Sequence, residues 1–388
     1  MGPDGFPTVG IVGGGQLARM MVQAAIPLGI HVRVLAERPE DSAARVAPAV
    51  DLGAPDDPEA LVAFAGRCDV VTLDHELVDL EALETIIAAG GVVRPGPSTL
   101  EFAKDKLHQR IRFAAAGLPV PEYEPVADAS SIERFAARLG WPVVAKAQRG
   151  GYDGRGVWVL ADAASAHGLV EACASRGVSL LVEEFVPIAN ELAVLVARRP
   201  GGERVTYPVV ETVQRDGICH EVIAPAPLDE AVTEEARRIG ERVAEVTEAV
   251  GVIATELFWT QDGRVLVNEV ATRPHNSGHF SIDGAATSQF ENHLRAVLDW
   301  PLGPTDLRAP AVVMANLLGA DSESLAPRLA ETLREEPRVH PYLYGKGVRP
   351  GRKVGHVNAL GDDPHETRER AVRAAARLTG RLVPGGTQ

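Results

Sequence analysis

The sequence contains few cysteines and no long hydrophobic run. Its three cysteines, Cys68, Cys173 and Cys219, are far apart and form no CxxC pair, which argues against structural zinc and against a disulfide framework. No apolar stretch approaches the roughly 18 residues that a membrane-spanning helix needs, and the N-terminus lacks the basic and apolar regions of a signal peptide. We therefore expect a cytoplasmic protein without a membrane anchor.

An excess of positive charge is also absent. The chain of 388 residues carries 39 Lys and Arg against 53 Asp and Glu, a formal net charge of −14. This balance argues against a nucleic-acid-binding surface, so any phosphate ligand must be bound by a local cluster of basic side chains. Because one hydrophobic core stops growing at roughly 250–300 residues, we expect two or three domains, and the 45% of hydrophobic residues suffices for ordinary globular cores.

The first hundred residues alternate predicted strands with predicted helices. The predicted strands are 8–12, 31–35, 50–52, 69–73 and 91–93, and the predicted helices are 16–28, 58–66 and 80–89. This βαβ order predicts a parallel sheet of the α/β class. After it, Ser98 and Glu101 match a capping box for one helix that runs to Ala116.

The rest of the chain has the mixed order of an α+β fold, with several strands in succession. The predicted strands are 142–146, 157–160, 179–185, 191–198, 205–210, 312–317 and 353–358, and the predicted helices are 130–139, 229–250, 288–300 and 365–378. The prolines of residues 301–310 predict a linker before the C-terminal part.

Residues 268–279, NEVATRPHNSGH, have the most distinctive composition in the chain. A hairpin over the turn at 261–263 would bring Glu256, in the preceding strand-like run, close to Asn268 and Glu269. Amide and carboxylate oxygens suit a hard divalent cation. The hairpin therefore predicts a cation site, and a polar hairpin with exposed charges is the alternative.

Cationic side chains follow these carboxylates. Arg273 and His275 come directly after Glu269 and suit an anion. Residues 349–353, RPGRK, place three more cations around a tight turn. This turn is either a second anion site or a basic surface turn.

Two glycine-rich segments can bind phosphate. GGGQLA at 13–18 follows the first predicted strand and opens a helix, which favours a phosphate; with Glu37 it also matches a dinucleotide fingerprint, and a tight turn is the third possibility. GGYDGRG at 150–156 can fold over a polyphosphate, with Arg155 and Lys146 adding charge. It lacks the residue order of a P-loop, and a flexible hairpin is its alternative.

A strand edge at 181–186 is a candidate nucleotide site. Its backbone can face an adenine while the Glu191 carboxylate takes the ribose hydroxyls. The pattern alone is unspecific, and a solvated strand edge is the favoured alternative.

Taken in order, these motifs resemble the ATP-grasp superfamily, and more narrowly the 5-(carboxyamino)imidazole ribonucleotide synthases of purine biosynthesis. The matching segments cover nearly the whole chain: GGGQLARM at 13–20, LDHE at 73–76, GGYDGRG at 150–156, the strand around Glu183, NEVATRPHNSGH at 268–279, TSQFE at 287–291 and residues 349–356. The related formate-dependent formyltransferases usually have Asp-Thr in place of Asn276-Ser277 and a serine-rich phosphate loop, and biotin carboxylases differ after the metal-binding residues. The narrower resemblance is favoured, and another ATP-grasp ligase such as a formate-dependent purine formyltransferase is the alternative.

The resemblance implies three domains: a Rossmann-like preATP-grasp domain over 1–105, an ATP-grasp domain over 106–303 that clamps ATP between two sheets, and a small C-terminal domain over 304–388. It implies ATP- and bicarbonate-dependent N-carboxylation of 5-aminoimidazole ribonucleotide, through carboxyphosphate, by an ADP-producing ligase. It also implies ATP and two magnesium ions as cofactors, and a homodimer.

The resemblance also assigns roles to individual residues. ATP is expected at Lys106, Lys146, Gly151, Tyr152, Asp153, Gly154, Gly156, Glu183, Glu184, Phe185, Val186, Glu191, Gln214, Asn268 and Glu269. The magnesium ions are expected at Glu256 and Glu269, and the ribonucleotide at Gly14, Gly15, Gln16, Leu17, Glu76, Arg352 and Lys353. The residues expected to act in catalysis are Tyr152, Asp153, Arg155, Arg273, His275 and Lys353.

Three positions depart from the family pattern. Lys106 stands where Arg is common, Gln214 where His is frequent and Thr272 where Pro is usual. Lys106 keeps the charge but lacks the forked hydrogen bonding of a guanidinium.

Two other classes of protein remain as alternatives. A nicotinamide oxidoreductase, suggested by GGGQLA alone, leaves the carboxylate hairpin unexplained, and an ATP-binding protein without catalysis is disfavoured by the presence of both metal carboxylates.

Overall fold

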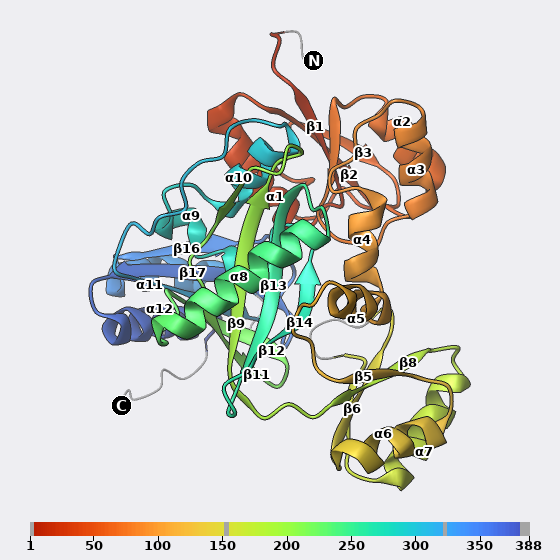
Figure 1. Cartoon of the computed structure of the whole chain (residues 1–388). Helices are drawn as coiled ribbons and strands as arrows, with labels where there is room; N and C mark the ends of the chain where they lie inside the picture. The colour runs from red at the N-terminus through yellow and green to blue at the C-terminus, as the bar shows by residue number, and fades with distance from the viewer. Residues whose placement is uncertain (1–3, 151–154, 321–323, 381–388) are drawn as a thin grey trace.

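The structure is a computed structural model that describes residues 4–150, 155–320 and 324–380. Figure 1 shows an N-terminal domain at the upper right, a large central sheet with its helices, and a smaller lobe at the lower right. The two sheets of the central part and the N-terminal domain surround the region where the predicted site residues gather.

The N-terminal domain is built on a four-stranded parallel sheet in the order β3-β2-β1-β4. Its elements are β1 (Thr8–Val12), α1 (Gln16–Ala25), β2 (His31–Ala36), β3 (Ala49–Leu52), α2 (Pro58–Ala65), β4 (Val70–Leu73) and α3 (Leu80–Ala88). Ile11 of β1, Met21 of α1 and Val34 of β2 are fully buried in one core cluster. The predicted α/β class is confirmed for this part.

The predicted strand at 91–93 is wrong. The structure describes these residues in full, and Val93 makes only an isolated parallel bridge with Val71 of β4. A single bridge adds one residue to the edge of the sheet without extending it.

The predicted helix from Ser98 to Ala116 is also wrong in detail, because two helices occupy this stretch. They are α4 (Pro97–Lys104), with Gly96 as its N-cap, and α5 (Lys106–Ala115). The Asp105 carboxylate accepts a hydrogen bond from His108 N at 2.9 Å and caps α5. The break places Lys106 in the first turn of a new helix, where it faces the cleft described below.

The lobe at the lower right of Figure 1 is a second four-stranded sheet, in the order β5-β8-β6-β7, with α6 and α7 beside it. Its elements are β5 (Tyr123–Val126), α6 (Ala129–Leu139), β6 (Val143–Ala147), β7 (Val157–Leu160), α7 (Ala163–Ala174) and β8 (Leu180–Glu184). All three strand pairs are antiparallel.

The largest sheet has nine strands, in the order β14-β13-β9-β11-β12-β15-β17-β16, with β10 paired to β9. Its first strands are β9 (Ile188–Arg198), β10 (Arg204–Thr206), β11 (Val210–Arg215), β12 (Ile218–Ala224), β13 (Gly251–Thr260) and β14 (Val265–Ala271). The long helix α8 (Glu230–Val246) packs on β9 and β13 through Ala236, Ile239 and Val243, which recur with helical spacing. The predicted α+β character of this part is confirmed.

The C-terminal residues extend this sheet. β15 (Ala311–Leu318) pairs with β12, and β17 (Lys353–Gly361) lies between β15 and β16 (Val339–Leu343). The helices of this region are η2 (Asn276–Gly278), α9 (Ser281–Gly284), α10 (Gln289–Val297), α11 (Ala326–Glu335) and α12 (Pro364–Thr379). The predicted domain boundary near residue 303 falls in the connection between α10 and β15, and strand hydrogen bonds cross between the two sides of it.

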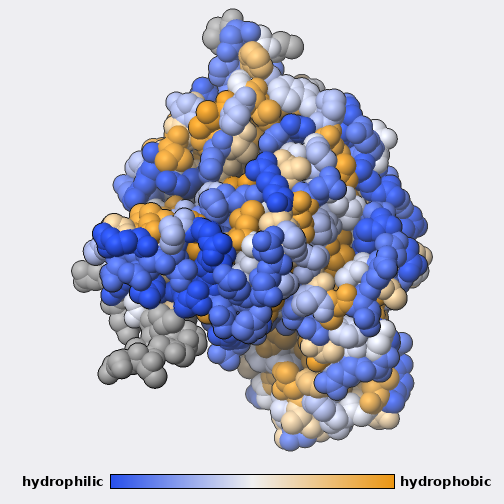
Figure 2. Space-filling view, turned by 90° about the vertical axis from the view of Figure 1, so that its left-hand side faces the viewer, coloured by the Kyte–Doolittle hydropathy of each residue, from blue (hydrophilic) through white to orange (hydrophobic). Residues whose placement is uncertain are grey.

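Within the described parts of the chain, no helix combines the length and the hydropathy needed to cross a membrane. The face shown in Figure 2 is mostly hydrophilic, with hydrophobic residues in small separate groups. Scattered exposed hydrophobic residues of this kind are normal on globular proteins.

Candidate active site

A cleft of about 930 Å³ lies where the parts of the structure meet. Its walls include Gln16 at the start of α1, Lys146 of β6, Glu256 of β13, Glu269 of β14 and Lys353 of β17. Small-molecule sites usually have volumes of about 300–1,000 Å³. The cleft is therefore large enough for a nucleotide together with a second substrate.

Positive side chains outnumber negative ones in the described lining of this cleft, whereas negative side chains outnumber positive ones in the whole chain. Among the residues that the structure describes, seven Lys and Arg side chains and four Glu side chains line it: Lys104, Lys106, Lys146, Arg149, Arg155, Arg273 and Lys353 against Glu76, Glu191, Glu256 and Glu269. A protein with a formal net charge of −14 thus concentrates cations at one place. This is the local basic cluster that a phosphate ligand requires.

The predicted hairpin is confirmed, and it borders the cleft. β13 and β14 are antiparallel, and Glu256 and Glu269 are direct partners across them. Their side chains are 27% and 36% exposed, and Glu269 forms an ion pair with Lys106.

These two carboxylates suit magnesium, although the protein does not form a complete metal cage. Among the described residues, no three His, Cys, Asp or Glu side chains are grouped for a metal ion. Mg²⁺ is commonly held by one or two carboxylates while phosphates and water supply the other oxygens. The paired, partly exposed Glu256 and Glu269 therefore fit the ion in the presence of a nucleotide.

A buried ion-pair network lies behind the hairpin. Glu183 of β8 accepts from Arg110 Nε at 2.8 Å and pairs with Lys146 Nζ at 2.8 Å, and Lys146 also donates to Asn268 Oδ1 at 3.1 Å. Burial alone would raise the pKa of the Glu183 carboxyl, but Arg110 and Lys146 outweigh burial and lower this pKa to about 2. The Glu183 carboxylate thus positions the Lys146 ammonium. The predicted strand edge at 181–186 is wrong for residues 181–184, because β8 lies between β5 and β6 and pairs with both. Phe185 and Val186, which follow β8, remain for the predicted adenine contact.

Two lining groups have pKa values close to neutral pH. Burial, together with the nearby Lys146 and Arg110, lowers the pKa of Lys106 to about 8. Burial, with Glu256 close by, raises the pKa of Glu191 to about 7. Strongly shifted groups in a single cleft are typical of functional sites.

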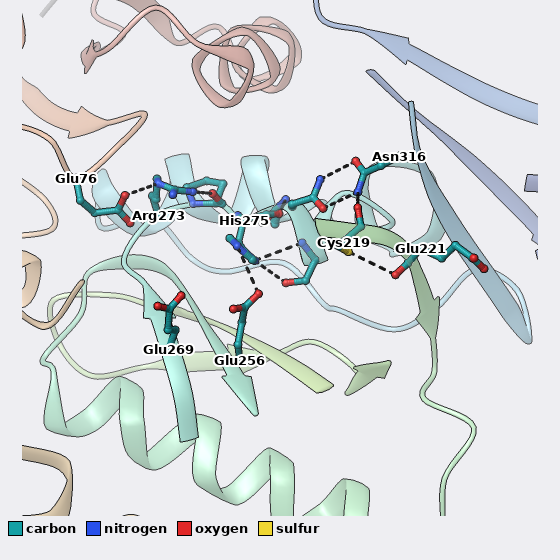
Figure 3. A network of polar contacts seen from close by, with 12 residues as sticks. Glu76, Cys219, Glu221, Glu256, Glu269, Arg273, His275 and Asn316 are labelled. Carbon is teal, nitrogen blue, oxygen red and sulfur yellow. Dashed lines mark hydrogen bonds and ion pairs between the residues drawn. The ribbon is translucent and has the colours of Figure 1, made fainter. Parts of the chain in front are cut away.

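Arg273, after the end of β14, reaches toward Glu76 of the N-terminal domain, whereas His275 points toward Glu256 (Figure 3). Arg273 Nε donates to Glu76 Oε2 at 2.9 Å. His275 Nε2 lies 3.9 Å from Glu256 Oε1, which is too far for a hydrogen bond. One wall of the cleft therefore holds the paired carboxylates next to a guanidinium and an imidazole.

The His275 imidazole is held as a neutral hydrogen-bond donor. Its Nδ1 lies 3.4 Å from Ser277 N and 2.9 Å from Ser277 Oγ. Because a backbone N–H can only donate, Nδ1 accepts and the ring proton lies on Nε2. Burial, followed by the charges of Arg273 and Lys353, lowers the pKa of His275 to about 3. The ring therefore stays neutral at physiological pH, with its N–H directed to the side of Glu256.

The predicted site residues fall into three groups. Those that line the cleft are Gln16, Leu17, Glu76, Lys106, Lys146, Arg155, Glu191, Gln214, Glu256, Asn268, Glu269, Arg273, His275 and Lys353. Those that are described but are not in its lining are Gly14, Gly15, Gly156, Glu183, Glu184, Phe185, Val186 and Arg352. Gly151, Tyr152, Asp153 and Gly154 lie outside the described residues.

The glycine turn before α1 is held by a carboxylate of the protein. Gly15 N and Ala18 N donate to the two carboxylate oxygens of Asp74, at the end of β4. A Cβ at position 15 would lie 2.2 Å from Asp74 Oδ2, so glycine permits this approach. An anion of the protein itself therefore accepts two of the N–H groups at this helix N-terminus, and the phosphate assigned to it stays a prediction. Gln16 and Leu17 remain as the residues of this turn that line the cleft.

Asp74, Arg110 and Lys346 belong to this site but are absent from the predicted residues. Lys346 donates to Gln16 Oε1, which joins the C-terminal region to the start of α1. The position of Asp74 in LDHE, two residues before Glu76, is the one signal in the sequence that points to it.

Comparison with known proteins identifies the family. The chain matches the ribonucleotide synthetase preATP-grasp domain over residues 6–104, the ATP-grasp domain over 111–290 and the phosphoribosylaminoimidazole carboxylase C-terminal domain over 312–370. It is 51% identical to the N5-carboxyaminoimidazole ribonucleotide synthase of Mycobacterium tuberculosis, over 98% of this chain and 90% of that protein. The chain belongs to the N5-carboxyaminoimidazole ribonucleotide synthase family.

Solved structures of this synthase family have the same fold. The synthetase of Thermotoga maritima is 38% identical with a TM-score of 0.84, covering 95% of this chain and 98% of that one. The Aspergillus clavatus synthase, in complex with ADP and 5-aminoimidazole ribonucleotide, is 31% identical with a TM-score of 0.88, covering 97% and 99%. The resemblance stated from the sequence and the predicted three-part fold are confirmed, and this family is neither a formyltransferase nor a nicotinamide oxidoreductase.

Proposed function

We propose that this chain uses ATP and bicarbonate to carboxylate the exocyclic amine of 5-aminoimidazole ribonucleotide, through carboxyphosphate. The chain is an ADP-producing ATP-grasp ligase of purine biosynthesis, as its family membership indicates. One observation carries the proposal: Lys146, Glu256 and Glu269 line the same cleft as Arg273 and His275. Side chains suited to a magnesium–nucleotide complex thus lie next to side chains suited to a second anion.

The cations of the cleft would bind the phosphates of ATP. Lys146 is fixed by Glu183 and Asn268, so its ammonium needs no reorganisation when charge develops on the transferring phosphoryl group. The main chain just after β8, at Phe185 and Val186, would face the adenine, and Glu191 would take the ribose hydroxyls. The glycine-rich segment 150–156, which contains Arg155, would cover the phosphates.

Magnesium would be held by Glu256 and Glu269 against these phosphates. When bound, it supplies positive charge that offsets the repulsion between ATP and bicarbonate. Lys106 pairs with Glu269 in the present structure. In the nucleotide complex its ammonium would contact the phosphates, as the resemblance implies.

Arg273 and His275 form a part of the cleft that we call the anion wall. This anion wall would hold bicarbonate and then carboxyphosphate. A bicarbonate oxygen attacks the γ-phosphorus, the bond from this phosphorus to the bridging oxygen breaks, and ADP leaves. Arg273 supplies positive charge at this place, and the neutral His275 supplies an N–H donor that stays protonated on Nε2 throughout the working pH range.

The second half of the reaction transfers the carboxyl group. The exocyclic amine forms a bond to the carboxyl carbon by one of two routes. It attacks carboxyphosphate while the bond from this carbon to the phosphate oxygen breaks, or it attacks carbon dioxide after that bond has broken. Phosphate leaves and the amine loses one proton. Lys353 and Asp153 would hold the amine acceptor, Tyr152 and Glu76 would face the imidazole, and Arg352 would bind the ribonucleotide phosphate.

Measurement of ADP release tests this function. The purified protein should form ADP and carboxylated ribonucleotide only when both bicarbonate and 5-aminoimidazole ribonucleotide accompany MgATP. A rate of ADP formation that is the same with and without bicarbonate and the ribonucleotide would reject the proposal. Binding of ATP without any turnover would favour an ATP-binding protein without catalysis.

We also propose that the chain works as a cytoplasmic homodimer, as the resemblance implies. Light scattering at micromolar concentration should then give twice the chain mass of 41.2 kDa. A single species of 41.2 kDa would refute the dimer.

A further inference from the structure

The TSQFE segment at 287–291 has no part in the function described so far, yet its glutamine contacts the anion wall. Gln289 is the first residue of α10 and is 0% exposed. Its Oε1 accepts from His275 N at 2.9 Å, and its Nε2 donates to His275 O at 2.8 Å. The side-chain amide therefore pairs with both main-chain groups of His275, as a neighbouring antiparallel strand does with its partner residue.

The same residue fixes the other end of the turn. Gln289 Nε2 also donates to His279 Nδ1 at 3.0 Å, and Gln289 N donates to Ser281 Oγ at 2.9 Å. A methyl group at Gly278 would lie 2.4 Å from Gln289 Oε1, so the glycine inside the turn permits this close contact. Residues 275–279 are thus tied at both ends to the start of α10.

A role in core packing does not account for these contacts. Burying an amide costs about 1–3 kcal/mol in proteins unless its hydrogen bonds are made, and a methionine would fill the same space without that requirement. The three hydrogen bonds of the Gln289 side chain go to His275 and His279, both of which line the cleft. The amide is placed to control the geometry of that wall.

We propose that Gln289 is a positioning residue for the carboxylation, which acts by holding the main chain of His275. It keeps His275 extended, at φ −125° and ψ 158°, and so keeps the imidazole Nε2 on the side of Glu256 (Figure 3). Gln289 is not among the described residues that line the cleft, so it affects the substrates only by positioning His275. This inference rests on the proposed function, in which His275 binds bicarbonate and carboxyphosphate.

The first test is a double-mutant cycle with Gln289→Met and His275→Ala. Gln289→Met removes all three side-chain hydrogen bonds, and we expect kcat/KM for bicarbonate to fall on the order of tenfold to a hundredfold, as small misplacements at a reacting centre do. ATP affinity, measured by calorimetry, should stay close to that of the parent. The double variant should be no worse than His275→Ala alone, because Gln289 then has nothing left to position. Fully additive losses would overturn the proposal.

Gln289→Glu gives a second readout that does not depend on the methionine variant being folded. A neutral carboxyl group can accept from His275 N and donate to His275 O, whereas a carboxylate can only accept. Because a buried carboxyl group has a raised pKa, kcat/KM for bicarbonate in this variant should recover toward the parent value as pH falls. A pH profile parallel to that of the parent would contradict the positioning role.

Asn292→Leu is the matched control. Asn292 lies on the same helix, is also 0% exposed, and bonds to Tyr207 Oη and to the backbone of Gly303, away from the cleft. This variant should lose thermal stability as Gln289→Met does, but keep the parent kcat/KM for bicarbonate. Equal kinetic losses in both variants would reduce Gln289 to a structural residue.

The parent protein separates this inference from the proposed function. If the parent forms no bicarbonate-dependent ADP, the proposed function fails and the positioning role fails with it. If the parent does so and Gln289→Met keeps the full kcat/KM for bicarbonate, the positioning role alone is wrong.

Discussion

Among single residues, Glu183 shows how burial and charge oppose each other in this cleft. Its side chain is 2% exposed, yet Arg110 and Lys146 keep it ionised. The resemblance pointed to Glu183 and Lys146, but nothing in the sequence pointed to Arg110. Residues 106–112, KLHQRIR, contain three Lys and Arg side chains and one His, and a local pattern does not show which of them turns inward.

Folding stability should depend on pH through Glu183. Its pKa in the folded protein is about 2 against an ordinary value of 4.5, so its stabilising contribution is complete above 4.5 and is lost as pH falls toward 2. A shift of this size corresponds to a free energy on the order of 3 kcal/mol. Urea unfolding of the parent and of Glu183→Gln, from about pH 6 to about pH 3.5, should show the steeper decline in the parent. Parallel declines would contradict this account of the ion pairs.

The carboxylates of the hairpin should be indispensable for turnover. We expect Glu269→Ala and Glu256→Ala each to lower kcat on the order of a hundredfold or more, since each removes a direct electrostatic element of the transition state. Circular dichroism should show an intact fold. Glu235→Ala on the exposed side of α8 is the control and should keep full activity. Near-normal turnover in a folded Glu269→Ala protein would remove the hairpin from the mechanism.

Lys106 should make the use of ATP dependent on pH. Burial, followed by Lys146 and Arg110, lowers its pKa to about 8, so its positive charge is lost as pH rises through that value. Because kcat/KM reports ionisations of the free enzyme, kcat/KM for ATP should fall above about pH 8. Lys106→Arg stays charged there, and its profile should be flatter. The same decline in both proteins would exclude Lys106 as the cause.

At the scale of secondary-structure elements, predictions succeeded where the signal was local. Two strand-like runs around Gln261-Asp262-Gly263 predicted the β13–β14 hairpin, and the register of that hairpin then placed Glu256 opposite Glu269. Asp216-Gly217 between β11 and β12 is a comparable turn signal, with φ of 52° and 72°. This second hairpin was missed because polar residues interrupt the apolar pattern of residues 210–218.

The break between α4 and α5 was not predictable in the same way, because it depends on a distant partner. Lys106 N donates to Gln148 O at 2.9 Å, from a segment 42 positions further along the chain. Local propensity favours a continuous helix, and this tertiary hydrogen bond together with the Asp105 cap overrides it.

The start of α1 should be destabilised by Asp74→Ala, which leaves Gly15 N and Ala18 N without their acceptor. We expect a loss of about 1–3 kcal/mol, the usual cost of buried unsatisfied groups. Because the adjoining Gln16 and Leu17 line the cleft, KM for the ribonucleotide should rise as well. Asp57→Ala removes the cap of α2 and should lower stability by about 1 kcal/mol. If it raised KM for the ribonucleotide equally, α1 would have no special link to the substrate.

At the scale of the whole molecule, the cleft is assembled from segments that lie far apart in sequence. Tyr342 Oη and Asn358 Nδ2 both donate to the Asp283 carboxylate at 2.8 Å, and Asn276 pairs with Asn316. These contacts join the C-terminal strands to the segment that carries His275. The sequence identified the separate motifs, but only the pairing of β12 with β15 brings them to one wall.

Coupling between the two half-reactions should therefore depend on the C-terminal part of the chain. Lys353, the first residue of β17, lines the cleft, while the neighbouring Arg352 donates to Gly347 O at 3.2 Å and is absent from the described lining. In Lys353→Ala, ADP should still be released, but less carboxylated ribonucleotide should appear per ATP consumed, because carboxyphosphate decomposes before the amine is in place.

Arg352→Ala is the comparison that separates coupling from binding. It should raise KM for the ribonucleotide more than KM for ATP, because the Arg352 guanidinium is assigned to the ribonucleotide phosphate, and it should leave the ratio of product to ADP close to that of the parent at saturating ribonucleotide. Both quantities come from one experiment in which ADP and carboxylated product are measured in the same samples. A product-to-ADP ratio in Lys353→Ala equal to the parent's would show that the C-terminal strand only encloses the cleft and does not hold the acceptor.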